Sequence, residues 1–315
     1  MTSSELLAAY LLDRFLGDPP WLPHPVRWMG RAIELAEGAL RPRKRDPLWE
    51  RIGGVALALG LPVLVYFLSK GMILVSGSAG VWGERAATVF LAFSALAAGS
   101  LRCEALAVRS ALQASDLPAA RSRLSRIVSR RTDGLGEEEI VRGAVESVAE
   151  NASDGVIGPL FYLLIGGVPL ALAYKAVSTL DSMVGYRDER YRDFGWASAR
   201  LDDLANLIPA RLTALLVVLS AVFLREDPKG SWRILRRDAG NDDSPNSGRP
   251  EAAVAGALGI QLGGPVRYRT GLLQKATIGE PVRPLGEEML FRAVRLMEVS
   301  TLLMVIMGAG ILWGL

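Results

Sequence analysis

Long apolar stretches, set between strongly charged segments, constrain the fold of this chain most. A membrane-spanning helix needs about 20 mostly apolar residues, and residues 52–75 meet that requirement with Lys70 near one end. Further apolar stretches lie at 86–101, 156–173, 204–224 and 296–315. The pattern predicts an all-α polytopic membrane protein with about four to five transmembrane or re-entrant helices and additional cytoplasmic helical segments.

Composition excludes several other classes of protein. The single cysteine, Cys103, excludes an internal disulfide framework and a cysteine-rich zinc site. The single histidine, His24, excludes a multi-histidine metal site. Basic residues are scattered along the chain, which argues against nucleic-acid binding. No linker or internal repeat divides the chain, and no cleaved signal peptide is expected, so we interpret residues 1–315 as a single multi-pass membrane domain.

The charged loops predict the orientation of the chain in the membrane. Residues 17–51, 102–154 and 225–295 are rich in Lys and Arg, whereas the link 76–84 has neither. Under the positive-inside rule the three long segments face the cytoplasm, which places the protein in the cytoplasmic membrane. Within 102–154, residues 105–131 are expected to form one soluble or interfacial helix.

Two apolar stretches carry residues that can break a helix. Residues 156–173 contain Gly166-Gly167-Val168-Pro169 at their middle, and residues 204–224 contain Pro209. Each stretch is therefore either an ordinary span or a broken one. A re-entrant arrangement would keep residues 181–203 near the cytoplasmic side, whereas two ordinary spans would place them outside.

Two polar clusters in the first half of the chain contain residue types that bind anions or metal. In the first, four prolines in seven residues fix an extended loop that carries Asp18, His24 and Arg27; a purely structural turn is the alternative. In the second, three carboxylates recur every four residues on one helix face beside Asn151. Their mutual repulsion favours a divalent cation or arginines as partners, and a solvated acidic face is the alternative. These carboxylates are Glu146, Glu150 and Asp154.

Two further clusters follow. The third combines basic and acidic residues: Lys175, Asp181, Arg187, Arg200, Asp202, Asp203, Asn206 and Arg211. Arg211 lies inside an apolar stretch, where an arginine needs a partner or a polar cavity, and Asp203 is our first choice. The fourth comprises Ser244, Asn246, Ser247 and Glu251 ahead of a short helix at 251–260 with Pro250 as its first residue. The start of that helix is either an anion site or an ordinary capped terminus.

Five stretches carry these clusters along nearly the whole chain: LGDPPWLPHPVRWMG, ESVAENASDGVIGPLFY, YKAVSTLDSMVGYRD, FGWASARLDDLANLIPARL and SPNSGRPEAAVAGALGIQLGG. In this order they resemble the CobD/CbiB family, the adenosylcobinamide-phosphate synthases of cobalamin biosynthesis. The resemblance implies an ATP-driven ligase that joins (R)-1-amino-2-propanol, or its O-phosphate, to a propionate carboxylate of adenosylcobyric acid. The chain departs from the family at Asp242, where a histidine is usual and where we expect a supporting role.

The expected cofactors are ATP and Mg²⁺, and the expected partners are adenosylcobyric acid, the amino-alcohol or its phosphate, the lipid bilayer and other membrane enzymes of the cobalamin pathway. We assign catalytic roles to His24, Glu150, Asp181 and Asp203. We assign metal binding to Glu146, Glu150, Asp154, Asp202 and Asp203. We assign substrate binding to Asp18, Arg27, Asn151, Lys175, Arg187, Arg200, Asn206, Arg211, Ser244, Asn246, Ser247 and Glu251.

Two other classes of function are alternatives to the ligase. A non-catalytic membrane sensor would resemble the AmpE proteins of β-lactamase regulation, but the intact carboxylates and the SPNSG stretch favour an enzyme. A transporter would need two similar halves with paired broken helices, and the sequence shows no internal repeat. Because one reaction must bring all its substrates together, the four clusters are expected to form one site at the cytoplasmic face of the membrane.

Overall fold

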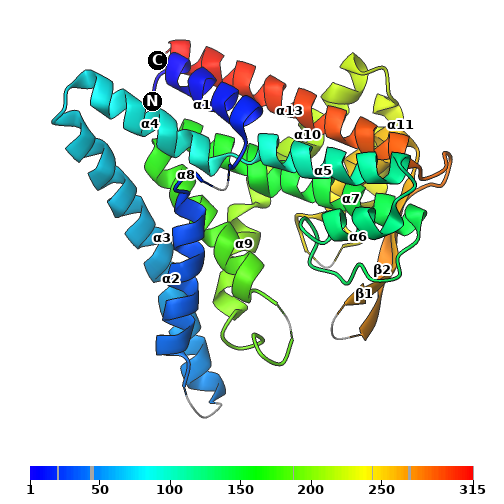
Figure 1. The fold of residues 1–315 in the computed structure, drawn as a ribbon, viewed down its shortest axis with the longest axis horizontal. Helices are drawn as coiled ribbons and strands as arrows, with labels where there is room; N and C mark the ends of the chain where they lie inside the picture. The colour runs from blue at the N-terminus through cyan, green and yellow to red at the C-terminus, as the bar shows by residue number, and fades with distance from the viewer. Residues whose placement is uncertain (20, 43–45, 187, 243, 269–270, 315) are drawn as a thin grey trace. The chain divides into compact units, whose positions relative to one another are not determined.

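The computed structural model is built almost entirely from helices, with one β-hairpin (Figure 1). It describes residues 1–19, 21–42, 46–186, 188–242, 244–268 and 271–314. The helices are α1 (Ser3–Leu16), α2 (Pro25–Leu40), α3 (Pro47–Gly77), α4 (Val81–Ala95), α5 (Ala98–Gln113), α6 (Leu117–Leu124), α7 (Glu137–Asn151), the π-helix η1 (Ala152–Ile157), α8 (Gly158–Val184), α9 (Trp196–Ala205), α10 (Leu207–Phe223), α11 (Pro228–Asp238), α12 (Gly248–Leu258) and α13 (Glu287–Gly314). The strands are β1 (Gln261–Tyr268) and β2 (Gly271–Gly279).

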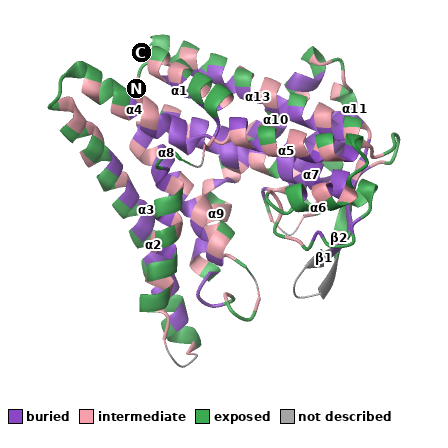
Figure 2. Cartoon of the chain, viewed as in Figure 1, coloured by how far each residue is buried: buried purple, intermediate pink, exposed green. Residues whose placement is uncertain are grey.

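Several helical runs are long and apolar enough to cross a membrane. There are four in the described part of the chain, Pro47–Gly77, Val81–Gln113, Glu137–Val184 and Glu287–Gly314, or five if the bent pair of α9 and α10 counts as one span. Along α3 the exposed side chains include Leu59, Phe67, Leu68 and Leu74, so much of its surface is suited to lipid (Figure 2). These features confirm the predicted all-α multi-pass membrane fold class.

The chain packs as two compact units. Unit 1 comprises Met1–Ala97, Gly158–Asn206 and Val305–Leu315, and unit 2 comprises Ala98–Ile157 and Leu207–Met304. Each unit is assembled from segments that are far apart in the sequence. The expectation of a single domain over residues 1–315 stays a prediction.

In unit 1, helix α8 reverses direction at a pair of glycines. Gly166 has φ −137° and ψ 17°, and Gly167 has φ 67° and ψ −165°, a conformation that is essentially restricted to glycine. The rings of Tyr162 and Tyr174 stack with centroids 4.7 Å apart, whereas 12 residues of continuous helix would separate them by about 18 Å. The two halves of α8 therefore lie alongside each other, and the chain leaves α8 on the side at which Gly158 entered. The predicted break at 166–169 is confirmed, and a continuous span through it is excluded.

The second stretch with a predicted break is interrupted at a different residue. Helix α9 ends at Ala205 and α10 begins at Leu207, so the chain breaks at Asn206 and not at Pro209. Pro209 lies in the first turn of α10, where a missing N–H costs no helical hydrogen bond. The choice of Pro209 as break point was wrong for this reason.

Unit 2 surrounds an apolar core contributed by α5, α6, α7, α10, α11, α12 and the first part of α13. The expected single helix at 105–131 is wrong, because it is divided between α5 and α6. Ser115 has φ 56°, and the Asp116 side chain then caps α6 by accepting from the Ala119 N–H at 2.9 Å. The expected helix at 251–260 is present as α12, but it begins at Gly248, so Pro250 is its third residue.

The β-hairpin of unit 2 was not predicted, and two buried carboxylates hold its base. Its strands are antiparallel, with a bulge between Leu262 and Gly264. Glu146 accepts a hydrogen bond from the N–H of Gly263 at 2.7 Å, and Asp238 accepts one from the N–H of Gly279 at 2.8 Å. Gly263 has φ 78°, and a Cβ there would collide with the carbonyl oxygen of Ala276. The hairpin base is therefore fixed both by sterics and by charge-assisted hydrogen bonds.

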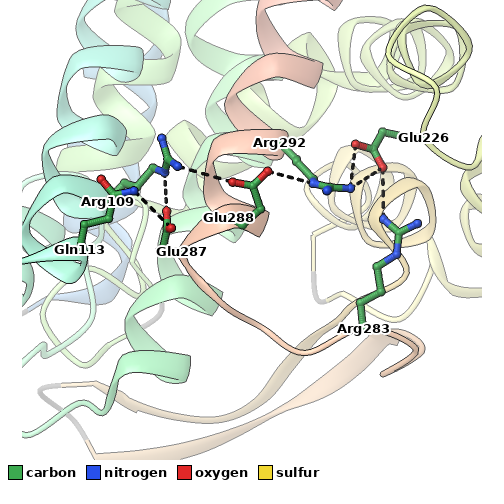
Figure 3. A network of polar contacts seen from close by, with 7 residues as sticks. All are labelled: Arg109, Gln113, Glu226, Arg283, Glu287, Glu288 and Arg292. Atoms are coloured by element: carbon green, nitrogen blue, oxygen red, sulfur yellow. Dashed lines mark hydrogen bonds and ion pairs between the residues drawn. The ribbon is translucent and has the colours of Figure 1, made fainter. Parts of the chain in front are cut away.

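A chain of ion pairs ties the start of α13 to its neighbours in unit 2 (Figure 3). Arg109 of α5 pairs with Glu287 and, at 3.5 Å, with Glu288. Arg292 lies 3.2 Å from Glu288 and 3.4 Å from Glu226, which also accepts from Arg283 at 3.3 Å; Gln113 donates to Glu287 at 3.2 Å. The network alternates in charge, so each inner side chain has partners on both sides.

Candidate functional site

The carboxylates of the second cluster run from the interior of unit 2 to its surface. Glu146 is 2% exposed and forms an ion pair with Arg130 in addition to its hydrogen bond with Gly263. Glu150 is exposed, and Asp154 is half-buried in the π-helix η1. Such π-helical turns are frequent at functional sites. Glu146 therefore has structural partners on both of its oxygens, whereas Glu150 and Asp154 reach solvent.

Glu251 lies fully buried near these carboxylates. Its side chain projects from the first turn of α12 and is 2% exposed. Burial raises the pKa of Glu251 well above its usual value, and the negative charge of Glu146 raises it further, while Lys275 acts in the opposite direction. The folded state therefore favours the neutral form of Glu251 more than the unfolded chain does.

The loop before α12 closes upon the carboxylate of Asp242. Asp242 Oδ1 accepts hydrogen bonds from the Ser244 N–H at 2.9 Å and from the Ser247 hydroxyl at 2.7 Å. Asp242 Oδ2 lies 3.5 Å from the Lys275 ammonium. The Ser244 hydroxyl in turn accepts from the N–H of Asn246 at 3.2 Å, and Asn246 is buried. Asp242 thus organises the loop through its two serine contacts and its ion pair with Lys275.

Two arginines lie close together where α10 packs against α12. Arg211 is exposed and donates to the carbonyl of Leu207 at 2.5 Å, and the half-buried Arg249 donates to the carbonyl of Pro245 at 3.2 Å. Burial and then the positive charge of Arg211 lower the pKa of the Arg249 guanidinium. Among the described residues both arginines have carbonyl rather than carboxylate partners, which suits the binding of an anion.

In unit 1, the first cluster forms a loop that closes on itself. The imidazole Nε2 of His24 lies 3.0 Å from Asp18 Oδ1, and the histidine is 7% exposed. The exposed Arg27 donates to the carbonyl of Pro19 at 3.2 Å and to that of Leu22 at 3.4 Å. The aspartate thus lies within ion-pairing distance of the imidazole ring, and the arginine holds the loop.

The third cluster is centred on the end of α9. The buried Tyr174 donates from its phenol to Asn206 Oδ1 at 2.7 Å, and Asn206 Nδ2 donates to Asp202 Oδ2 at 3.0 Å. Arg200 lies 3.8 Å from Asp203 on the same helix. The result is a polar group at the break between α9 and α10, on the unit 1 side.

The remaining residues of this cluster lie on α8 or outside the description. Lys175 and Asp181 are half-buried on the second half of α8. A Cβ at Gly185 would meet the Asp181 carboxylate, so this side chain lies over the end of the helix. Arg187 lies outside the described residues. The predicted pair of Arg211 with Asp203 joins residues of different units and stays a prediction.

The predicted metal ligands do not form a closed cage by themselves. Across the described ranges, no group of three or more His, Cys, Asp or Glu side chains has an arrangement that could hold a metal ion. Mg²⁺ is commonly bound through one or two carboxylates together with waters and substrate phosphates. Glu150 and Asp154 are four residues apart at the junction of α7 and η1, whereas Asp202 and Asp203 are adjacent on α9. The magnesium assignments stay predictions.

The structure brings the second and fourth clusters together in unit 2, and it places the first cluster and most of the third in unit 1. Unit 2 unites Glu146, Glu150, Glu251 and the Ser244–Ser247 loop, while unit 1 contains Asp18, His24 and the end of α9. Asn151 donates to the Ser147 carbonyl at 2.9 Å on its own helix. The expectation that all four clusters form one site stays a prediction.

Several residues of these sites were not predicted from the sequence. Tyr174 directly precedes Lys175, inside a stretch that was already singled out, so its place in the sequence was a usable signal. Arg130, Asp238 and Lys275 had no comparable signal, because each meets its partner through contacts distant in sequence.

Comparison with known proteins finds similarity to one protein family. The family model described as "CobD/Cbib protein" matches residues 6–297. The chain is 52% identical over 308 residues to "Cobalamin biosynthesis protein CobD" of Geobacter metallireducens, covering 96% of this chain and 95% of that one. It is 45% identical over 311 residues to the protein of the same name from Klebsiella pneumoniae, covering 99% and 98%. No solved structure matches the chain.

Proposed function

Because this chain belongs to the CobD/CbiB family of cobalamin biosynthesis proteins, we propose that it is an adenosylcobinamide-phosphate synthase of the cytoplasmic membrane. It joins the amine of (R)-1-amino-2-propanol, or of its O-phosphate, to a propionate carboxylate of adenosylcobyric acid and uses ATP to drive the amide bond. The observation that carries the proposal is the match of residues 6–297 to one family, which includes all four clusters.

The contacts in unit 2 support the binding of phosphorylated substrates. Arg211 and Arg249 place two positive charges near the start of α12, and Lys275 lies beside the loop of Ser244 and Ser247. Burial raises the pKa of the neighbouring Glu251, which favours its neutral form and so weakens its repulsion of a phosphate. A nucleotide or an amino-alcohol phosphate is the kind of ligand that this combination favours.

The chemistry requires activation of the carboxylate before amide formation. A carboxylate oxygen attacks the terminal phosphorus of ATP, ADP leaves, and the amine nitrogen then attacks the acyl carbon and expels inorganic phosphate. Mg²⁺, when bound by Glu150 and Asp154 or by Asp202 and Asp203, would neutralise phosphate charge. His24, held by Asp18 at 3.0 Å, is our choice for the base that takes the proton from the ammonium.

The proposal is tested with purified protein in detergent. Adenosylcobyric acid, ATP and Mg²⁺ are incubated with each of the two amine forms, and the corrinoid product is measured by mass spectrometry. We expect a product whose mass equals the two substrates less water, formed only with ATP, and His24→Ala should slow its formation. Folded protein that yields no product with either amine would overturn the proposal.

A further inference from the structure

Tyr174, Asn206 and Asp202 form a hydrogen-bonded series at the end of α9. The Tyr174 phenol lies 2.7 Å from Asn206 Oδ1, and Asn206 Nδ2 lies 3.0 Å from Asp202 Oδ2. Tyr174 and Asn206 are only 3% and 1% exposed. Because Asn206 is so deeply buried, its amide is poorly placed to contact a substrate directly.

The chemistry of the three groups fixes the direction of each hydrogen bond. An ionised carboxylate only accepts, so the NH₂ group of Asn206 must face Asp202 and its carbonyl must face Tyr174. The phenol of Tyr174 is therefore the donor to Asn206. Rotation of the Asn206 amide would place a carbonyl oxygen against the carboxylate oxygen, which is unfavourable.

The reversal of α8 supplies the tyrosine. Tyr162 and Tyr174 lie on opposite sides of Gly166 and Gly167, and their stacked rings hold the phenol of Tyr174 against Asn206. Tyr162 uses its own phenol differently, because it donates to the backbone carbonyl of Ala205 at 2.9 Å. Two chemically identical side chains in one stack thus have different partners.

From this geometry we propose that Tyr174 and Asn206 are positioning residues that hold the Asp202 carboxylate in its working orientation. The inference rests on the proposed function, in which Asp202 serves the reacting phosphates. Residues that orient a site carboxylate through a hydrogen bond typically change activity by about 10- to 100-fold when they are replaced.

The test compares two tyrosine variants that each lose one hydroxyl group. Tyr174→Phe and Tyr162→Phe are assayed for kcat, for KM of ATP and for thermal unfolding in detergent. Tyr174→Phe should lower kcat about 10-fold or more with little change in unfolding temperature, whereas Tyr162→Phe should retain the wild-type kcat. Asn206→Ala should lower kcat as well, and Tyr174→Phe combined with Asn206→Ala should be no slower than Asn206→Ala alone, because the two residues act in series.

The outcomes separate this inference from the proposed function. If the wild type is active and Tyr174→Phe has the same kcat as Tyr162→Phe, the positioning role is overturned while the proposed function stands. Equal kcat losses in both tyrosine variants, accompanied by lower unfolding temperatures, would show a structural role only and would also overturn it. A folded but inactive wild type would overturn the proposed function, and this inference with it.

Discussion

Replacement of Glu146 by alanine should destabilise unit 2 strongly, even in the absence of metal. The substitution removes the acceptor for the buried N–H of Gly263 and an ion-pair partner of Arg130, whose side chain is only 12% exposed. An unsatisfied buried N–H costs about 1–3 kcal/mol, and the loss of one partner from a buried ion pair costs about 3–5 kcal/mol. Because the two costs overlap, we expect a total loss of about 3–5 kcal/mol in the free energy of unfolding.

Glu138→Ala is the matched control, since Glu138 lies on the same helix and pairs with Arg142. Its side chain is 64% exposed, and such a pair contributes about 0.3–0.5 kcal/mol. Both variants are unfolded thermally in detergent without Mg²⁺, and amide hydrogen exchange is followed at the hairpin. Glu146→Ala should unfold on the order of 10 °C lower and exchange faster at Gly263. Equal, small losses in both variants would refute the structural role of Glu146.

Three other changes test separate parts of the fold. Gly167→Ala should lower the free energy of unfolding by about 1–3 kcal/mol, because alanine disfavours the backbone conformation at this position. Gly60→Ala in α3, where a Cβ meets open space, should instead stabilise the protein. Thermal unfolding compares the two variants, and equal effects would contradict the reversal of α8. Because the pKa of Glu251 is raised, the folded protein binds this proton more tightly than the unfolded chain does. Stability should therefore fall as pH rises from the unfolded pKa of about 4.3 towards the pKa in the folded protein. Unfolding temperatures between pH 5 and 8 should decline less in Glu251→Gln than in the wild type, and parallel declines would refute this pH dependence. Glu226→Ala should cost about 1 kcal/mol, because it separates two partly exposed arginines, Arg283 and Arg292, from their shared acid; an unchanged unfolding temperature would show that the network of Figure 3 adds no stability.

The sequence was sufficient to predict those features that depend on local pattern. The length and hydropathy of residues 52–75 predicted the span that α3 provides, and Gly166-Gly167 predicted the break in α8. Pro209 was misleading, because a proline interrupts a helix only beyond its first turn. The turn at Ser115 was missed as well, although Asp116 and Pro118 are ordinary signals for the start of a helix.

Features that depend on contacts distant in the sequence could not be predicted in the same way. The β-hairpin is held by Glu146 and Asp238, which lie 117 and 41 residues from their partners. The four-residue spacing indicated that Glu146 belongs to a row of carboxylates. It could not show that Arg130 forms an ion pair with one oxygen of Glu146 and that Gly263 donates a hydrogen bond to the other. Tyr174 is different, because its position directly before Lys175 was a usable signal that was missed.

Transfer of oxygen from the substrate carboxylate to phosphate tests the central claim most directly. Adenosylcobyric acid labelled with ¹⁸O in the reacting carboxylate is incubated with the purified protein, ATP, Mg²⁺ and the amino-alcohol or its phosphate. If the carboxylate is activated by phosphoryl transfer, each amide formed should release one inorganic phosphate that contains one ¹⁸O atom, with the second ¹⁸O retained in the amide. Amide product accompanied by unlabelled phosphate would contradict the account.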